Sequence, residues 1–175
     1  MAEFYLTDSK GYRHSLFVTE KSYDIEANTS VVEYTYQLKS GSNNGFSSYG
    51  IGWEVWINGV RVQSHAQKTG EYTCMKGGKV LTFCTGTATI EHNADGSKSI
   101  NCYALFKSMD GTSYCPVVGT KPSGTLELTK IPRGAGYIDN GTDADRYQAY
   151  IDPDGSAFNH YMPYSDNGTG WDMLG

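Results

Sequence analysis

The side chains able to do acid–base or metal chemistry are few and widely spaced in this chain. No His-x-x-x-His pair, nucleophile elbow, phosphate-binding loop or dinucleotide fingerprint occurs in the sequence. Without such a spacing, a histidine is expected to be a surface or strand residue rather than a metal ligand or a base. The histidines are His14, His65, His92 and His160.

Three carboxylates are candidates for the paired acids of glycoside hydrolysis. Glu33, Glu54 and Glu91 all fall at outward positions of predicted strands. Hydrolysis needs two carboxylates at a defined separation across a cleft, and outward strand positions provide none. We therefore expect no enzyme activity, no catalytic residue and no cofactor, and keep a hydrolase built on the β-fold as the alternative.

Aspartates near the end of the chain invite comparison with calcium sites. Calcium needs about six to eight oxygen ligands converging on one point. The aspartates instead stand in Asx-Gly turns that are a repeat length apart, so we interpret them as turn residues and expect no metal. They are Asp139, Asp152, Asp154 and Asp166.

The cysteines match no zinc-binding spacing, because there is no Cys-x-x-Cys and no neighbouring histidine pair. They are Cys74, Cys84, Cys102 and Cys115. In a reducing compartment we expect buried, reduced thiols. A Cys74–Cys84 or a Cys84–Cys102 disulfide is the alternative.

Composition points to an all-β protein. The 175 residues include 21 Gly and 14 Tyr, and no long helical period is visible. The formal net charge of −5 argues against binding to nucleic acid, and no apolar run approaches a membrane span. No secretory signal is recognisable, so we expect synthesis and folding in a cytoplasm.

The strongest strand signal is the stretch from Gly86 to Phe106. Apolar and polar residues alternate before and after a turn at Asn93–Gly96, as in half-buried strands. The pattern predicts a long antiparallel hairpin whose apolar face is covered by a second sheet.

Alternation predicts several more strands before residue 131. Asn58-Gly59 is a strong signal for a two-residue turn within a second hairpin, in which Trp53 faces the core and Trp56 faces away. Segments 40–50 and 64–78 are predicted loops. Seven to nine short strands favour an immunoglobulin-like antiparallel sandwich over residues 1–131, with a jelly roll as the alternative. The additional strands are Tyr12–Glu20, Asn28–Leu38, Ile51–Val62, Thr112–Val118 and Ser123–Ile131.

One group of aromatic side chains is a candidate glycan-binding platform. Trp56 faces away from the core, and Phe46 and Tyr49 are the large side chains of the 40–50 loop. Together they could stack on a sugar ring or bind a partner. The alternative is that they pack beneath their own loop.

Residues 132–136 are rich in Gly and Pro and predict a linker to a C-terminal extension, 137–175. The motif Tyr137-Ile138-Asp139-Asn140-Gly141-Thr142 recurs in altered form from Tyr150 and again from Tyr164. Each copy is predicted to be a short strand, an Asx-Gly turn and a second short strand.

Three such units are too small to bury their aromatic side chains alone. We expect these side chains to bind a neighbouring protein, because aromatic anchors dominate interfaces. A flap folded on its own sandwich and a tail ordered only in an assembly are the alternatives. The expected contact residues are Tyr137, Tyr147, Tyr150, Phe158, Tyr161, Tyr164 and Trp171.

Three stretches resemble structural proteins of tailed phages. They are the run from Gly86 to Ile100, the run from Leu126 to Arg133, and the Tyr-Ile-Asp-Asn-Gly-Thr repeat with its following Trp. They are similar to tail or baseplate components of siphoviruses that infect Gram-positive bacteria.

The resemblance implies a virion protein in a tail, baseplate or fibre, in contact with other virion proteins and with a part in host attachment. We also expect a homo-oligomer, such as a trimer or a higher ring. A carbohydrate-binding module for wall glycans and a capsid decoration or head-fibre protein are the alternatives.

Overall fold

The computed structural model describes residues 1–111, 114–132, 164–166 and 171–173. Every regular element among these residues is a β-strand, and all pairings are antiparallel. The all-β prediction is therefore confirmed for the described part of the chain.

Sheet one contains four strands in the order β1-β2-β3-β8. In β3 every second side chain, from Ser30 to Leu38, is buried, which is the alternation that the sequence shows. The strands are β1 (Ala2–Thr7), β2 (Arg13–Asp24), β3 (Thr29–Lys39) and β8 (Val80–Glu91).

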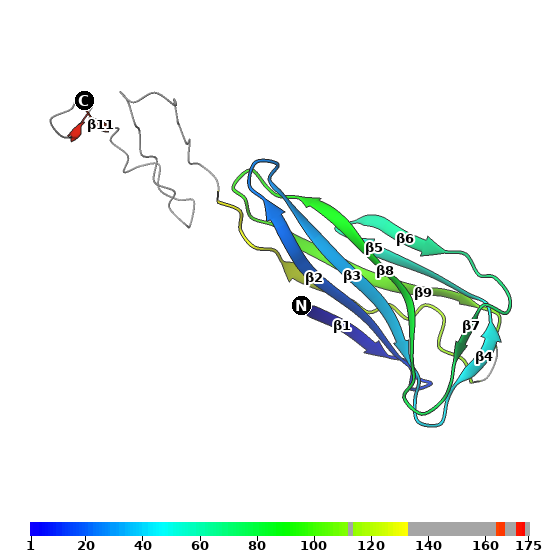
Figure 1. Cartoon of the computed structure of the whole chain (residues 1–175). Coiled ribbons are helices and arrows are strands. Elements are labelled where there is room, and N and C mark those ends of the chain that lie inside the picture. Colours follow the sequence, from blue (N-terminus) through cyan, green and yellow to red (C-terminus); the bar gives the residue numbers. More distant parts are fainter. Residues whose placement is uncertain (112–113, 133–163, 167–170, 174–175) are drawn as a thin grey trace.

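Sheet two has the order β10-β9-β5-β6. A separate pair, β4 with β7, lies at the end of the body opposite the β2–β3 turn (Figure 1). The strands are β4 (Phe46–Tyr49), β5 (Ile51–Ile57), β6 (Val60–His65), β7 (Tyr72–Cys74), β9 (Ser99–Met109) and β10 (Ser123–Glu127).

The two four-stranded sheets pack face to face around an aromatic core (Figure 1). Ring contacts join the sheets: His14 of β2 lies 5.2 Å from Phe106 of β9, and Tyr36 of β3 lies 6.5 Å from Trp53 of β5, between ring centroids. Trp53 is 3% exposed, which confirms its predicted place in the core.

The predicted hairpin between Gly86 and Phe106 is wrong. β8 pairs with β3 in sheet one, whereas β9 pairs with β5 and β10 in sheet two. The turn itself forms, since the Gly96 amide donates to the Asn93 carbonyl at 2.9 Å, but it carries the chain from one sheet to the other. Alternation shows which side chains face the core, and both sheets face the same core, so alternation does not identify the partner strand.

The second predicted hairpin is confirmed. β5 and β6 pair through Ile57 and Val60, and the two turn residues, Asn58 and Gly59, have φ values of 51° and 79°. Positive φ at both central positions is the geometry that Asn-Gly favours.

Several boundaries differ from the predicted ones. β1 was not predicted, because it is an edge strand whose side chains are at most half-buried. The predicted loops 40–50 and 64–78 contain the short strands β4 and β7. Residues 114–118, which the structure describes within the predicted strand Thr112–Val118, are irregular, and the buried Pro116 lacks the amide that a strand would use.

The thiols of Cys74, Cys84 and Cys102 are reduced and buried, as expected. Burial raises the pKa of Cys84 and of Cys102 to about 11. At neutral pH these side chains are neutral thiols that fill the core.

In the C-terminal extension, β11 (Tyr164–Asp166) pairs antiparallel with β12 (Trp171–Met173). Residues 133–136 of the predicted linker and the first two copies of the repeat lie outside the described residues. The threefold repeat therefore stays a prediction.

Candidate functional site

The outer face of sheet two carries a stacked aromatic pair. Trp56 of β5 and Tyr103 of β9 are direct cross-strand neighbours, and their ring planes are 14° apart with centroids 5.6 Å apart. Both side chains are half-buried. The pairing of β5 with β9 therefore creates a patch that neither strand has alone.

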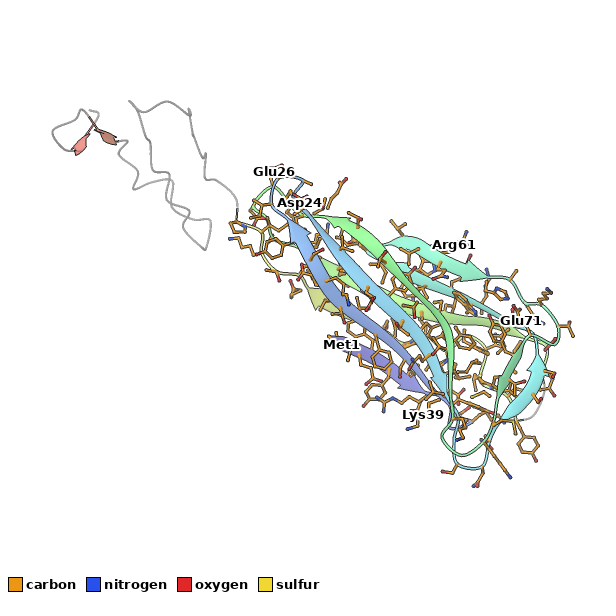
Figure 2. The ribbon with its side chains drawn as sticks, viewed as in Figure 1. Met1, Asp24, Glu26, Lys39, Arg61 and Glu71 are labelled. Atoms are coloured by element: carbon orange, nitrogen blue, oxygen red, sulfur yellow. The ribbon has the colours of Figure 1, made fainter. Side chains whose placement is uncertain are left out.

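Two cations extend this pair into a row across the sheet. The Lys121 ammonium lies 3.7 Å from the centroid of the Tyr103 ring, and the Arg61 guanidinium lies 6.0 Å from that of Trp56. Such contacts contribute about 0.5–1 kcal/mol each at exposed sites. We call Lys121, Tyr103, Trp56 and Arg61 the aromatic–cation row. Figure 2 shows its Arg61 end on β6, at the edge of the molecule opposite Met1.

Beside the row, Glu54 is almost covered by its neighbours. Its carboxylate accepts hydrogen bonds from Lys107 Nζ at 2.6 Å, Trp56 Nε1 at 3.1 Å and Arg61 Nη1 at 3.3 Å. The bonds from Lys107 and Trp56 lower the pKa of Glu54, so it stays ionised. Glu54 therefore pairs with two cations, Lys107 and Arg61. Lys121 is a third cation on the same face and does not bind Glu54.

The arrangement favours an acidic or aromatic partner over a stacked sugar. Tyr103 contacts two groups, the Trp56 ring and the Lys121 ammonium, which lies over the Tyr103 ring. A sugar ring stacking on the face beneath Lys121 would have to displace this cation. The row offers half-buried rings and cationic head groups, which suit carboxylates and further aromatic side chains.

The outer face of sheet one is balanced by comparison. Glu3 pairs with Arg13 at 2.8 Å, and Lys21 pairs with Glu33 at 3.2 Å. Each described ion pair of this face joins one cation to one carboxylate. On the outer face of sheet two, three cations, Arg61, Lys107 and Lys121, stand against two carboxylates, Glu54 and Glu127, so this face keeps a small positive excess.

The structure separates Trp56 from the other two residues of the predicted glycan platform. Phe46 is buried, whereas Tyr49 is half-buried. The centroid of the Phe46 ring lies 6.1 Å from that of Tyr12 and 6.2 Å from that of Tyr49. Trp56 instead stacks on Tyr103. Phe46 therefore follows the alternative interpretation, in which the side chain packs beneath its own loop.

The sequence did not single out Tyr103, Arg61, Lys107 or Lys121. Alternation from Ser99 to Phe106 places Tyr103 on the outer face, but only the strand register shows that it meets Trp56. Of the predicted contact residues in the extension, Tyr164 and Trp171 fall in β11 and β12. The other five lie outside the described residues.

The candidate carboxylates do not converge. Glu33 and Glu91 lie on sheet one, whereas Glu54 lies on the outer face of sheet two. Glu54 therefore shares no cleft with the other two. Within the described ranges there is no group of three or more His, Cys, Asp or Glu that could hold a metal ion, and no helix there is long and apolar enough to span a membrane.

A buried network fixes the end of the body near residue 8. His14 Nε2 lies 3.4 Å from Asp8 Oδ2, and His14 Nδ1 lies 3.1 Å from the Tyr36 hydroxyl. Asp8 also accepts the Val117 amide at 2.8 Å. Burial raises the pKa of Asp8, but the bonds from His14 and three backbone amides outweigh it and lower the pKa overall. Because His14 is fully buried, we assign the network a structural role.

A second network lies where the chain leaves the body. His92 Nδ1 lies 2.8 Å from the Gly96 carbonyl oxygen, and His92 Nε2 lies 2.8 Å from Ser30 Oγ. Ser30 donates to Glu20 at 2.6 Å, and Glu20 also accepts the amide and hydroxyl of Thr129.

Backbone hydrogen bonds add to this second network, and we call the region that they join the corner of the sandwich. The Ile131 amide donates to the Gly96 carbonyl, and the Leu128 amide donates to the Lys98 carbonyl. The corner therefore joins β2 and β3 of sheet one to the segment after β10 of sheet two. Figure 2 labels Asp24 and Glu26 at this end of the body.

Comparison with known proteins gives one family. The family model described as "Siphovirus protein of unknown function (DUF859)" matches residues 1–173. No curated protein matches the chain.

Proposed function

This chain belongs to the DUF859 family of siphovirus proteins, and we propose that it is a non-enzymatic structural protein of the phage particle. In this proposal the sandwich is a rigid body and the aromatic C-terminal residues bind a neighbouring virion protein. A tail, baseplate or fibre position with a part in host attachment is favoured over capsid decoration.

The observation that carries the proposal is the division of charge and aromatic residues along the chain. Residues 1–132 contain twelve Lys or Arg and twelve Asp or Glu, whereas residues 133–175 contain two Arg and seven Asp. The same 43 residues contain seven aromatic side chains. Aromatic side chains are the usual anchors of interfaces, and a net charge of −5 favours a partner surface of opposite charge.

The topology supports a body of immunoglobulin type. With β1 set aside, sheet one reads β2-β3-β8 and sheet two reads β10-β9-β5-β6. These orders correspond to A-B-E and G-F-C-C′ of immunoglobulin-like sandwiches. We include this fold assignment in the proposal, with β1 as an added edge strand.

Binding of a host-wall glycan is the second candidate. The observation in its favour is the half-buried Trp56–Tyr103 pair on an outer face. The cations beside the rings make it the weaker candidate, because they occupy the positions that a stacked sugar needs.

The test is to locate the protein in intact particles. We expect mass spectrometry of gradient-purified virions to find the chain, and antibody labelling with electron microscopy to place it on the tail. A protein found in infected cells but absent from purified virions would contradict the structural role. Loss of glycan binding in Trp56→Ala would instead support the second candidate.

A further inference from the structure

We propose that the aromatic–cation row of one copy binds residues 133–175 of a neighbouring copy. This inference rests on the proposed structural role and names the surface that the C-terminal residues recognise. The partner surface is the outer face of sheet two around Trp56 and Tyr103.

Charge is the first argument. The whole formal charge of the chain, −5, resides in residues 133–175, because residues 1–132 are balanced. On the outer face of sheet two, Arg61 and Lys107 both bind Glu54 Oε1, at 3.3 Å and 2.6 Å. A single carboxylate therefore neutralises only one of these two cations.

Lys121 adds to the excess. Its ammonium lies over the Tyr103 ring, and it takes part in no ion pair among the described residues. On sheet one Arg13 and Lys21 are paired with Glu3 and Glu33, and the exposed Lys39 is matched in charge by the exposed Glu91. An acidic segment is therefore attracted to sheet two more strongly than to sheet one.

Aromatic complementarity is the second argument. The row presents the half-buried rings of Trp56 and Tyr103 beside cationic groups, and Leu105 lies half-buried on the same face of β9. Tyr, Trp and Arg are the side chains that contribute most at interfaces. Residues 133–175 supply five Tyr, one Phe and one Trp among their seven Asp. Aspartates can bind the cations while the rings pack between them.

The geometry of such a contact explains assembly. The binding surface and the bound segment are different parts of the chain, so each copy offers one and uses the other. Head-to-tail contacts of this kind close into rings when the rotation allows. The contact would thus produce a trimer or a higher ring without a further interface.

The experiment is zero-length cross-linking of the full chain. Equal amounts of ¹⁴N and ¹⁵N protein are mixed and treated with a carbodiimide, which joins lysine amines to carboxylates in contact. We expect mixed-isotope cross-links from Lys107 and Lys121 to aspartates between Asp139 and Asp172. Same-isotope cross-links alone would mean that the segment folds on its own body and would overturn the inference.

A charge-reversal pair tests the surface independently. Arg61→Glu with Lys121→Glu should weaken self-association, measured by sedimentation, by roughly tenfold or more. Arg13→Glu with Lys21→Glu, on the other sheet, is the control and should change it little. Circular dichroism shows whether both variants fold.

The outcomes separate this inference from the proposed function. Mixed-isotope cross-links to Lys21 or Lys39 in place of Lys107 and Lys121 would overturn the inference while leaving assembly through residues 133–175 intact. An anionic wall polymer that binds the wild-type chain but not the Arg61/Lys121 variant, with no cross-link to the segment, would also overturn it. Absence of the chain from virions would contradict the structural role itself.

Discussion

At the scale of single residues, hydrogen-bond counting fixes the protonation of His92. The Gly96 carbonyl can only accept, so His92 Nδ1 carries a proton. The Ser30 hydroxyl has one proton, which it donates to Glu20. We therefore predict that His92 Nε2 donates to Ser30 Oγ and that both ring nitrogens carry a proton.

We expect ¹⁵N NMR of the folded protein to show both ring nitrogens of His92 protonated. His14 is the internal control: its Nε2 donates to Asp8 and its Nδ1 accepts from the Tyr36 hydroxyl, so it should show one protonated nitrogen. A neutral His92 would mean that Glu20 holds the proton instead.

The carboxylates of the two networks predict a loss of stability in acid. Burial raises the pKa of Glu20, but bonds from Ser30 and Thr129 outweigh it and lower the pKa overall; Asp8 behaves in the same way. A lowered pKa in the folded state stabilises the protein above the unfolded pKa, and this contribution is lost as pH falls through the folded pKa.

Urea unfolding between pH 7 and pH 3 measures this effect. Glu20→Gln should lower the free energy of unfolding at pH 7 by about 1 kcal/mol and flatten its decrease towards pH 3. Glu26→Gln, at an exposed position on the same end of the body, is the control. An equal pH dependence in the Glu20 variant and the wild type would contradict this role.

At this scale the sequence predicted orientation better than contact. Alternation correctly placed Trp53 inward and Trp56 outward, because orientation follows from the period of a single strand. The partner of Trp56 depends on how β5 and β9 align, which involves residues about 50 positions apart along the chain. The histidines were predicted to be surface or strand residues, and His14 and His65 lie in β2 and β6. The pattern did not show that His14 and His92 are buried, because their polar partners include residues of other strands.

At the scale of elements, the contact between β1 and β10 can be tested by one methyl group. A Cβ added at Gly124 of β10 would overlap the ring of Phe4 on β1. Both are edge strands, but the segment after β10 is held by bonds from Leu128 to Lys98 and from Ile131 to Gly96, so we expect β1 to move rather than β10. Gly124→Ala should lower stability by about 1–3 kcal/mol and speed hydrogen exchange of β1 amides.

A double mutant isolates the cause. Phe4→Ala removes the ring and should itself destabilise, but adding Gly124→Ala in that background should cost much less than in the wild type. Additive effects of the two changes would show that the ring contact is not the reason for glycine at this position.

Strand pairing could be predicted where the sequence signal lies within a few neighbouring residues. The Asn58-Gly59 turn specifies the β5–β6 hairpin within a few residues. The crossing after β8 has an equally good turn, yet its strands belong to different sheets. Whether the strand after a turn pairs with the strand before it depends on the other strands of the fold. Here β8 pairs with β3 and not with β9.

At the scale of the whole molecule, the separation of charge predicts salt-dependent association. If the acidic segment binds the cationic face of sheet two, raising the salt concentration from about 0.05 M to 0.5 M should weaken self-association, because screening shortens the range of the attraction. Sedimentation equilibrium at both concentrations measures it. The Arg61→Glu/Lys121→Glu variant should respond little, and an equal response in wild type and variant would contradict the electrostatic part of the inference.

The fold class was predictable from the whole sequence, whereas its topology was not. Frequent turns, aromatic residues and alternation suffice for an antiparallel β-protein. The order of strands in sheet two depends on long-range pairs such as Ile57 with Cys102, which leave no local trace.

The corner at Glu20, His92 and Ile131 has a mechanical consequence. Any tension transmitted through the C-terminal residues would enter the body where Thr129 bonds to Glu20 of one sheet and Ile131 bonds to Gly96 at the crossing between sheets. The pull would be shared by both sheets instead of peeling β10 from its edge. A sandwich attached in this way can bear a pulling force from neighbouring proteins and stay folded.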